Sequence, residues 1–175
     1  FTNSFIYKYL HKWTDININQ LAYSVNSQIK TKNEIIKIKS PVKFPLLNLD
    51  NEVLIYTKAT KFIDLNEDIE NKALEIVGSE TDLNKVVFKI ADWVKNNIEY
   101  NLSTLTAEAV QSSSWVLKNK QGVCDELTNL FISMLRSIGI PARFVSGMVY
   151  TNLDYNFGPH GWAEEPREGG GDRCI

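Results

Sequence analysis

The feature that most constrains the fold of this 175-residue chain is an amphipathic stretch that begins at a cysteine. Cys124, Asp125 and Glu126 open it, and the apolar residues that follow are spaced at i, i+3, i+4 and i+7. They are Leu127, Leu130, Phe131, Met134, Leu135 and Ile138. Gly139 and Pro141 then end the pattern, as residues that terminate helices commonly do. The sequence therefore predicts a buried helix with Cys124 in its first turn.

Two more helices are expected upstream of the cysteine. Asn66 offers a capping side chain for a helix over residues 67–77, and Gly78 is its expected stop. Asp82 starts a second apolar stripe, which predicts a helix over residues 82–98. The first 65 residues instead show short apolar or alternating runs, which predict the strands of an antiparallel β layer. These runs cover residues 4–10, 34–38 and 52–57.

Strands are expected after the cysteine helix. Residues 142–150 are rich in Val, Phe and Tyr, a composition that predicts a strand. The Gly-Pro dipeptide at positions 158 and 159 is expected to break the chain, so that a further strand starts at His160. Because side chains alternate along a strand, His160, Trp162 and Glu164 are expected to share one face.

A thiol in the first turn of a helix lies near unpaired backbone N–H groups and the positive end of the helix dipole. This position lowers its pKa from about 8.5 and favours the nucleophilic thiolate. Asp125 and Glu126 oppose thiolate formation, so activation of Cys124 requires a stronger partner such as an imidazolium. Of the two histidines, His11 falls in the predicted β layer, whereas His160 follows the cysteine helix closely. The alternatives are a buried, unreactive thiol and a hydrogen-bonded strand histidine.

The chain from Gly122 to Gly147, followed by His160-Gly-Trp162-Ala-Glu164, resembles the transglutaminase-like core of the papain-like cysteine protease superfamily, in its microbial members. The resemblance covers residues 59–164. It implies an α+β, papain-like fold in which a central helix headed by the cysteine packs on an antiparallel sheet that carries the histidine.

The resemblance also implies a reaction. In this family a thiolate attacks a carboxamide or peptide carbonyl, and water or an amine resolves the resulting thioester. Cys124 would be the nucleophile, and His160 would shuttle protons. The family uses an Asp on the following strand to orient the histidine, about sixteen residues after it. Asp172 lies only 12 positions after His160 and is a poor substitute for that residue.

The C-terminal tail differs from the rest of the sequence in its amino-acid composition. The chain has few arginines, yet Arg167 and Arg173 both fall in its last nine residues, together with three consecutive glycines. Pro166 interrupts the family pattern, and no apolar alternation follows to form the missing strand. We hypothesise that residues 165–175 are foreign to the domain, through a frameshift, a truncation or a cloning remnant.

Upstream of the thiol, Gln111, Trp115 and Gln121 are candidates for stabilising an oxyanion, and the alternative is that they are ordinary loop and core residues. A disulfide between Cys124 and Cys174 would consume the nucleophile, and the odd tail makes Cys174 a weak partner. The spacing of Cys and His residues matches no metal motif, so no metal or other cofactor is expected.

Charge and hydropathy exclude several classes of partner. A net charge of −2 gives no strong field for nucleic acid. The apolar runs are far shorter than the ~20 residues that cross a bilayer, so no membrane span is expected. Because the chain begins at Phe1 rather than Met, export with removal of a signal sequence is an expectation, and the compartment is left open.

The predicted organisation is a β-rich N-terminal extension over residues 1–58, a transglutaminase-like core over residues 59–165 and an atypical tail over residues 166–175. The predicted function is a cysteine-dependent hydrolase or acyltransferase that acts on a protein or peptide substrate. The alternative is a catalytically impaired peptide-binding or structural module that lacks the orienting Asp. A homodimer in which a partner chain supplies the missing strand is a further expectation.

Overall fold

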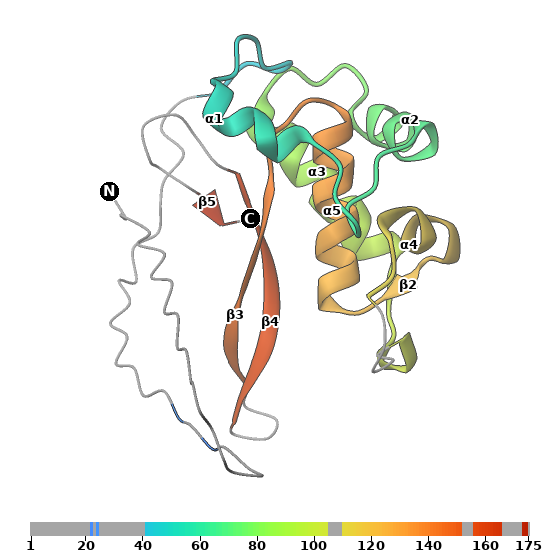
Figure 1. Cartoon of the computed structure of the whole chain (residues 1–175). Helices are drawn as coiled ribbons and strands as arrows, with labels where there is room; N and C mark the ends of the chain where they lie inside the picture. The colour runs from blue at the N-terminus through green and yellow to red at the C-terminus, as the bar shows by residue number, and fades with distance from the viewer. Residues whose placement is uncertain are drawn as a thin grey trace. The chain divides into compact units, whose positions relative to one another are not determined.

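A central helix headed by Cys124 organises the fold. In the computed structural model, which describes residues 22, 24, 41–104, 110–151, 156–165 and 173–174, this helix is α5 (Cys124–Ser137). It lies between a long β hairpin on one side and other helices on the other (Figure 1). These helices are α2 (Glu67–Val77), α3 (Leu83–Asn97) and α4 (Ser113–Asn119).

The described residues from Pro41 onward belong to one compact unit, which includes Ser40–Ile175. A second unit, Asn3–Lys39, contains only two described residues, Ala22 and Ser24. The strands predicted over residues 4–10 and 34–38 therefore lie outside the described residues. The predicted domain boundary at residue 58 stays a prediction.

Helices α2 and α3 begin at the capping residues that the sequence predicts. Asn66 Oδ1 accepts the N–H of Ile69 at 2.9 Å, and Asp82 Oδ1 accepts the N–H of Asn84 at 3.0 Å. Gly78 follows α2 with φ +58°, a conformation that glycine adopts without a Cβ penalty. Both predicted helices are confirmed, the second with bounds one residue inside the expected range at each end.

The predicted cysteine helix is also confirmed, and its apolar face is the centre of the core. Leu130, Met134 and Leu135 have no exposed surface and pack in one cluster with residues of α2 and α3, among them Ile69 and Ile90. Burial of each such side chain contributes about 1.5–3 kcal/mol to folding. This core holds α5 rigidly, and with it the cysteine at its start.

The β hairpin consists of β3 (Arg143–Thr151) and β4 (Asn156–Glu165), paired antiparallel along their full length. The strand predicted over residues 142–150 is confirmed. The predicted break at Gly158-Pro159 is wrong, because β4 begins at Asn156 and runs through both residues. Pro159 pairs with Met148, and the described residues pair the other edge of β4 only at its last two positions. An edge position of this kind, which no other described strand pairs, tolerates a proline without an N–H donor.

A short strand, β5 (Arg173–Cys174), pairs antiparallel with Glu164 and Glu165 at the end of β4. The expectation that the tail forms no strand is therefore wrong for these two residues. Strand pairing uses backbone N–H and C=O groups, so two residues can pair without an apolar alternation in the sequence. The hypothesis that residues 165–175 are foreign to the domain stays a prediction.

The strand predicted over residues 52–57 is wrong. The segment forms α1 (Asn51–Leu54) and a 3-10 helix (Ile55–Thr57). Periodicity alone does not separate a strand from a helix in so short an apolar run. Tertiary contacts decide the outcome here, because the C=O of Tyr56 accepts the N–H of Ala142 at 3.0 Å. Among the described residues before Lys58, the β contact found is an isolated bridge between Lys43 and Asp82.

Phe62 and Asp64, which precede α2, link α4 to α5 through hydrogen bonds. The N–H of Ser113 donates to the C=O of Phe62 at 2.9 Å, and the N–H of Ser114 donates to Asp64 Oδ1 at 3.1 Å. From the other side, Ser133 Oγ of α5 donates to the C=O of Asp64. These bonds fix α4, and so the chain that leads from it into Cys124, against the central helix.

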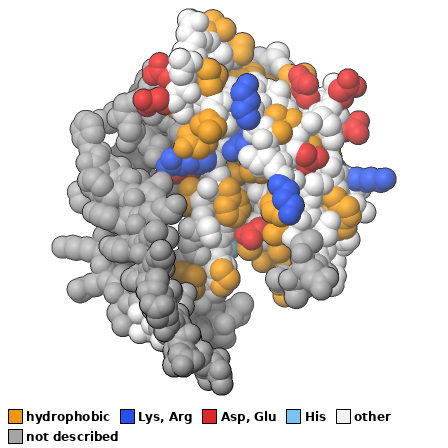
Figure 2. Space-filling view, in the orientation of Figure 1, with side chains coloured by type: hydrophobic (Ala, Val, Ile, Leu, Met, Phe, Trp, Pro, Cys, Tyr) orange, Lys and Arg blue, Asp and Glu red, His pale blue; other side chains and the backbone are white. Residues whose placement is uncertain are grey.

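The described surface carries mixed charge. Figure 2 shows acidic and basic side chains interspersed with hydrophobic ones over the visible part of this surface, in keeping with a net charge of −2. Within the part of the chain that the structure describes, no helix has the length and apolar character needed to cross a membrane.

Candidate active site

Cys124 is the first residue of α5, and Val123 precedes it in an extended conformation. The thiol is free and half-buried. Val123 has no side-chain acceptor, so the Glu126 side chain, from the first turn of α5, caps the helix start. Glu126 Oε2 accepts the N–H of Val123 at 3.0 Å, and Glu126 Oε1 accepts the N–H of Gln111 at 3.2 Å. The buried Glu126 carboxylate therefore positions the backbone in front of the cysteine.

The surroundings of the thiol act against its ionisation. Burial is the main cause that raises the pKa of Cys124, and the negative charge of Asp125 raises it further. Cys124 Sγ lies 3.6 Å from Asp125 Oδ1, as donor to that oxygen. The backbone N–H of Gly161 acts in the opposite direction and lowers the pKa. The predicted opposition of Asp125 to thiolate formation is confirmed, whereas Glu126 is occupied with backbone N–H groups.

Gly161 allows β4 to lie directly against the first turns of α5. A Cβ at this position would lie 2.4 Å from Phe144 Cζ and 2.8 Å from Asp125 Oδ1. Thr128 Oγ1 of α5 donates to the C=O of Gly161 at 3.4 Å. The absence of a side chain at Gly161 is therefore what brings the strand that carries His160 up to the helix that carries Cys124.

His160 lies on β4 opposite Gly147 of β3. Its ring is half-buried and contacts the Trp162 ring edge-on, with 4.9 Å between centroids and an interplanar angle of 79°. Trp162 in turn lies over Gly147, where a Cβ would be 2.8 Å from Trp162 Cζ3. The predicted common face of His160 and Trp162 is thus confirmed, and Trp162 fixes one side of the imidazole.

Glu164, the third residue predicted on that face, has a different role. It is buried, and its carboxylate accepts hydrogen bonds from Arg143 on the neighbouring strand, at 2.8 Å from Nε and 2.7 Å from Nη2. Arg143 and Glu164 are also register partners in the hairpin. This ion pair joins the start of β3 to the end of β4, and it occupies the Glu164 carboxylate.

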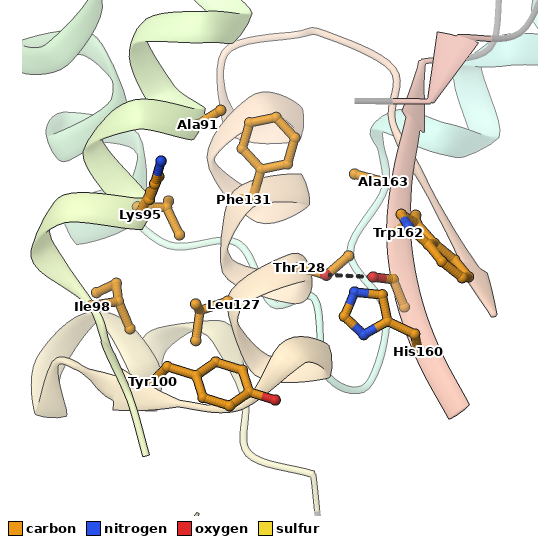
Figure 3. Close-up of a pocket in the computed structure, with 12 residues that line it drawn as sticks. Ala91, Lys95, Ile98, Tyr100, Leu127, Thr128, Phe131, His160, Trp162 and Ala163 are labelled. Atoms are coloured by element: carbon orange, nitrogen blue, oxygen red, sulfur yellow. Dashed lines mark hydrogen bonds between the residues drawn. The ribbon is translucent and has the colours of Figure 1, made fainter. Parts of the chain in front are cut away.

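A groove of about 640 Å³ opens beside the cysteine, between α3 and β4 and over α5 (Figure 3). Tyr100, Thr128, His160 and Gly161 line the end of the groove that faces the first turns of α5. The thiol interacts with two of these residues, Tyr100 and Gly161, so Cys124 lies at this end. A substrate bound in the groove would thus reach both predicted catalytic side chains.

Tyr100 is a site residue to which the sequence analysis assigned no role. It lies in β1 (Glu99–Tyr100), which pairs in parallel with β2 (Gln121–Gly122), so that Tyr100 faces Gly122. The Tyr100 side chain lies near Cys124, whose backbone and thiol both influence the pKa of the phenol. Burial first, and then the negative charge of the thiolate, raise the pKa of Tyr100. Only the pairing of β1 with β2, which has no local sequence signal, could have identified it.

Trp115 and Gln121 are not among the residues that line the groove. Trp115 is half-buried on α4 and lines a separate depression with Lys72 and Lys118. The Gln121 side-chain oxygen accepts the amide of Asn101 at 3.0 Å. The oxyanion roles of Trp115 and Gln121 stay predictions. Asp172 and His11 lie outside the described residues, and so does the side chain of Cys174.

The described residues hold no group of three or more His, Cys, Asp or Glu side chains that could bind a metal ion. Near the thiol, the acidic side chains are already engaged: Asp125 with the thiol itself and Glu126 with two backbone N–H groups. The site is therefore built from thiol, imidazole, phenol and backbone N–H groups.

A helix headed by a cysteine, packed against a strand that carries a histidine, is the arrangement of a papain-like thiol site, and comparison of the sequence identifies its family. The profile of the transglutaminase-like superfamily matches residues 70–171. The chain belongs to this superfamily. The predicted α+β, transglutaminase-core fold is confirmed for the described residues.

Known proteins similar to this chain support the same fold. A candidate cysteine protease of Cytophaga hutchinsonii superposes with a TM-score of 0.61 at 22% identity, over 76% of this chain and 44% of that one. The periplasmic domain of TgpA from Pseudomonas aeruginosa superposes with a TM-score of 0.54 at 19% identity, over 73% of this chain and 47% of that domain.

A relative in sequence is an uncharacterized protein of Mycobacterium leprae. It is 35% identical over 71 residues, which are 40% of this chain and 24% of that protein. The chain thus spans between about a quarter and half of the length of these similar proteins.

Proposed function

We propose that this chain is a cysteine-dependent hydrolase or acyltransferase that acts on peptide or carboxamide bonds through a thioester. The observation that carries the proposal is the position of the Cys124 thiol, at the start of α5 and against the N–H of Gly161, the residue after His160. Nucleophile and base therefore come from two elements that Gly161 allows into contact.

In the proposed first step, His160 takes the proton of the thiol and the sulfur of Cys124 attacks the substrate carbonyl carbon, so that a C–S bond forms. The carbonyl oxygen becomes an oxyanion, for which the backbone N–H of Cys124 is the proposed donor. Tyr100, which lines the groove near Cys124, would lie beside this oxyanion.

Collapse of this intermediate breaks the C–N bond, and the imidazolium of His160 gives its proton to the leaving amine. A thioester on Cys124 results. Water or a second amine then attacks the thioester carbonyl and loses its proton to His160, which returns that proton to the departing thiolate. The products are a carboxylic acid or a new amide. Asp172 is the proposed orienting residue, and Trp115 and Gln121 are proposed to assist the oxyanion.

A catalytically impaired binding module is the second candidate, and one observation favours it. Burial and the charge of Asp125 both raise the pKa of Cys124, which reduces the thiolate available at neutral pH. A module of this kind would keep the groove and bind peptides without forming a thioester.

The two candidates differ in whether a thioester forms. The full chain is incubated with a mixture of synthetic peptides, quenched in acid and analysed by intact mass, with a fluorescent primary amine present in parallel to detect transfer. For the enzyme we expect an acyl adduct on Cys124 and a turnover that falls by about 10²–10⁴-fold in His160→Ala. Cys124→Ala should abolish both signals.

Lys85→Ala, at an exposed position of α3 outside the groove, is the control and should retain full turnover. Absence of any adduct, together with an alkylation rate of Cys124 that is the same in His160→Ala, would reject the enzyme and support the module.

A homodimer formed by strand exchange also belongs to the proposal. Among the described residues, β4 is paired on its outer edge only by the two residues of β5, and the proposed partner strand would pair along the remainder of that edge. Light scattering over a range of protein concentrations tests this idea. A mass of one chain, 20.0 kDa, at every concentration would contradict it.

A further inference from the structure

The groove beside Cys124 has a chemical character of its own. Its volume of about 640 Å³ lies within the ~300–1,000 Å³ that is typical of ligand sites. Figure 3 shows side chains of α3 on one side and of β4 on the other, with Leu127 and Phe131 of α5 between them. The space is larger than one side chain needs, so the groove can hold a short peptide segment.

The walls of the groove are mostly apolar. Val94, Ile98, Phe131 and Ala163 belong to the hydrophobic core and expose an edge of it here. Leu127 adds a half-buried aliphatic surface close to the reactive end. A bulky aliphatic or aromatic side chain would cover this apolar surface and remove it from water, whereas a small or polar side chain would leave the surface exposed to solvent.

The described lining of the groove carries a positively charged side chain and no negatively charged one. Lys95, on α3, is exposed on its wall, and none of its described lining residues is acidic. In the part of the chain that the structure describes, no carboxylate lies within salt-bridge distance of Lys95, whereas Lys72 and Arg143 each have an acidic partner. The Lys95 ammonium is therefore available to a ligand, and it would repel a basic one.

We propose that the groove is the specificity site of the enzyme and that it binds a peptide in which a bulky apolar side chain is followed or preceded by an acidic residue. This inference rests on the proposed function for the identity of the ligand as substrate. The apolar side chain would lie on Ile98, Leu127 and Phe131, and the carboxylate would pair with Lys95. Tyr100 and His160 at the other end bring the bound peptide to the thiol.

Binding to Cys124→Ala tests this preference apart from catalysis. Four fluorescein-labelled peptides of one length carry Leu-Glu, Leu-Gln, Leu-Lys or Ala-Glu at the same central positions, and fluorescence anisotropy gives their dissociation constants. We expect Leu-Glu to bind about two- to fivefold more tightly than Leu-Lys, the size expected for an exposed ion pair. Replacing Leu by Ala should cost about tenfold.

Lys95→Glu, introduced into the same background, should reverse the order of the Leu-Glu and Leu-Lys peptides. Lys85→Glu makes the same change of charge on α3 outside the groove and should leave the order unchanged. Equal affinities for all four peptides, or an order that Lys95→Glu does not alter, would overturn the inference.

The same peptides given to the unmutated chain separate this inference from the proposed function. Turnover without the Leu-Glu preference would support an enzyme and reject the specificity site. Selective binding without any adduct on Cys124 would support the site and reject the enzyme.

Discussion

Tyr100 and Gly122 are register partners in the parallel pairing of β1 with β2, and this pairing brings the Tyr100 phenol close enough to Cys124 for the thiolate charge to raise the pKa of the phenol. The backbone N–H proposed to stabilise an oxyanion therefore lies next to a side chain that lines the groove.

Tyr100→Phe should slow alkylation of Cys124 at neutral pH. A phenol that stays protonated can donate to the thiolate, and the raised pKa of Tyr100 keeps it protonated while the thiol ionises. Loss of that donor removes stabilisation from the thiolate, so the pH profile of iodoacetamide labelling should move to higher pH. Peptide mapping of the Cys124 peptide measures the rate. Tyr150→Phe, on the exposed side of β3, is the control, and identical profiles for the two variants would contradict this prediction.

Asp125→Asn should act in the opposite direction. The Asp125 carboxylate lies 3.6 Å from the thiol and its charge raises the pKa of Cys124, after burial. The neutral amide keeps the shape and removes the charge, so thiolate should form at lower pH than in the unmodified chain and labelling at pH 7 should become faster. The same labelling series measures it.

Asp92→Asn, on the exposed side of α3, is the matched control for this change of charge. If both Asp variants label at the rate of the unmodified chain, the charge of Asp125 does not govern the thiol.

Gly161→Ala should destabilise the fold by about 1–3 kcal/mol, the range for overpacking. The added methyl would meet the Phe144 ring of β3 and the Asp125 carboxylate of α5, so these side chains or the strand would have to shift. Urea denaturation measures the loss. Gly158→Ala, in the same strand with open space around it, should be near neutral. Equal stability of the two variants would show that the close approach at Gly161 is not required.

Arg136→Ala should cost about 2–4 kcal/mol, because two backbone carbonyls lose their partner in a largely buried site. Arg136 Nε and Nη2 donate to the C=O of Ala142 at 2.8 and 2.7 Å, and Nη1 donates to the C=O of Lys58. Thermal unfolding followed by circular dichroism measures the effect. Lys85→Ala, at an exposed position, should remain within about 0.5 kcal/mol of the unmodified chain, and a similar value for Arg136→Ala would refute the buried role.

The helices could be predicted from the sequence because their signals are local. Asn66, Asp82 and Gly78 mark helix ends through their own backbone and side-chain chemistry, and the apolar period of α5 reflects contacts made along a single face. The segment at residues 52–57 carries no such signal. Its Tyr56 carbonyl accepts the N–H of Ala142, which is far away in the sequence, and a local pattern could not indicate a helix there.

The same distinction applies to the site. Cys124 and His160 stand out because a helix start and a strand position are visible in the sequence, and the family resemblance joined them. Tyr100 could not be found in this way, since its approach to the thiol depends on the parallel pairing of two strands of two residues each. The role of Gly161 as a point of contact likewise appears only when Phe144 and Asp125 are placed around it.

The pairing of β1 with β2 has a consequence for how this site can change. Two backbone hydrogen bonds, from Glu99 N–H to the C=O of Lys120 at 2.8 Å and from Asn101 N–H to the C=O of Gly122 at 2.9 Å, tie the end of the groove wall to the residues just before the nucleophile. The distance between wall and nucleophile is set by these bonds rather than by the length of the intervening chain. A change in the length of the chain between Asn101 and Lys120 should therefore leave Tyr100 and Cys124 at the same separation.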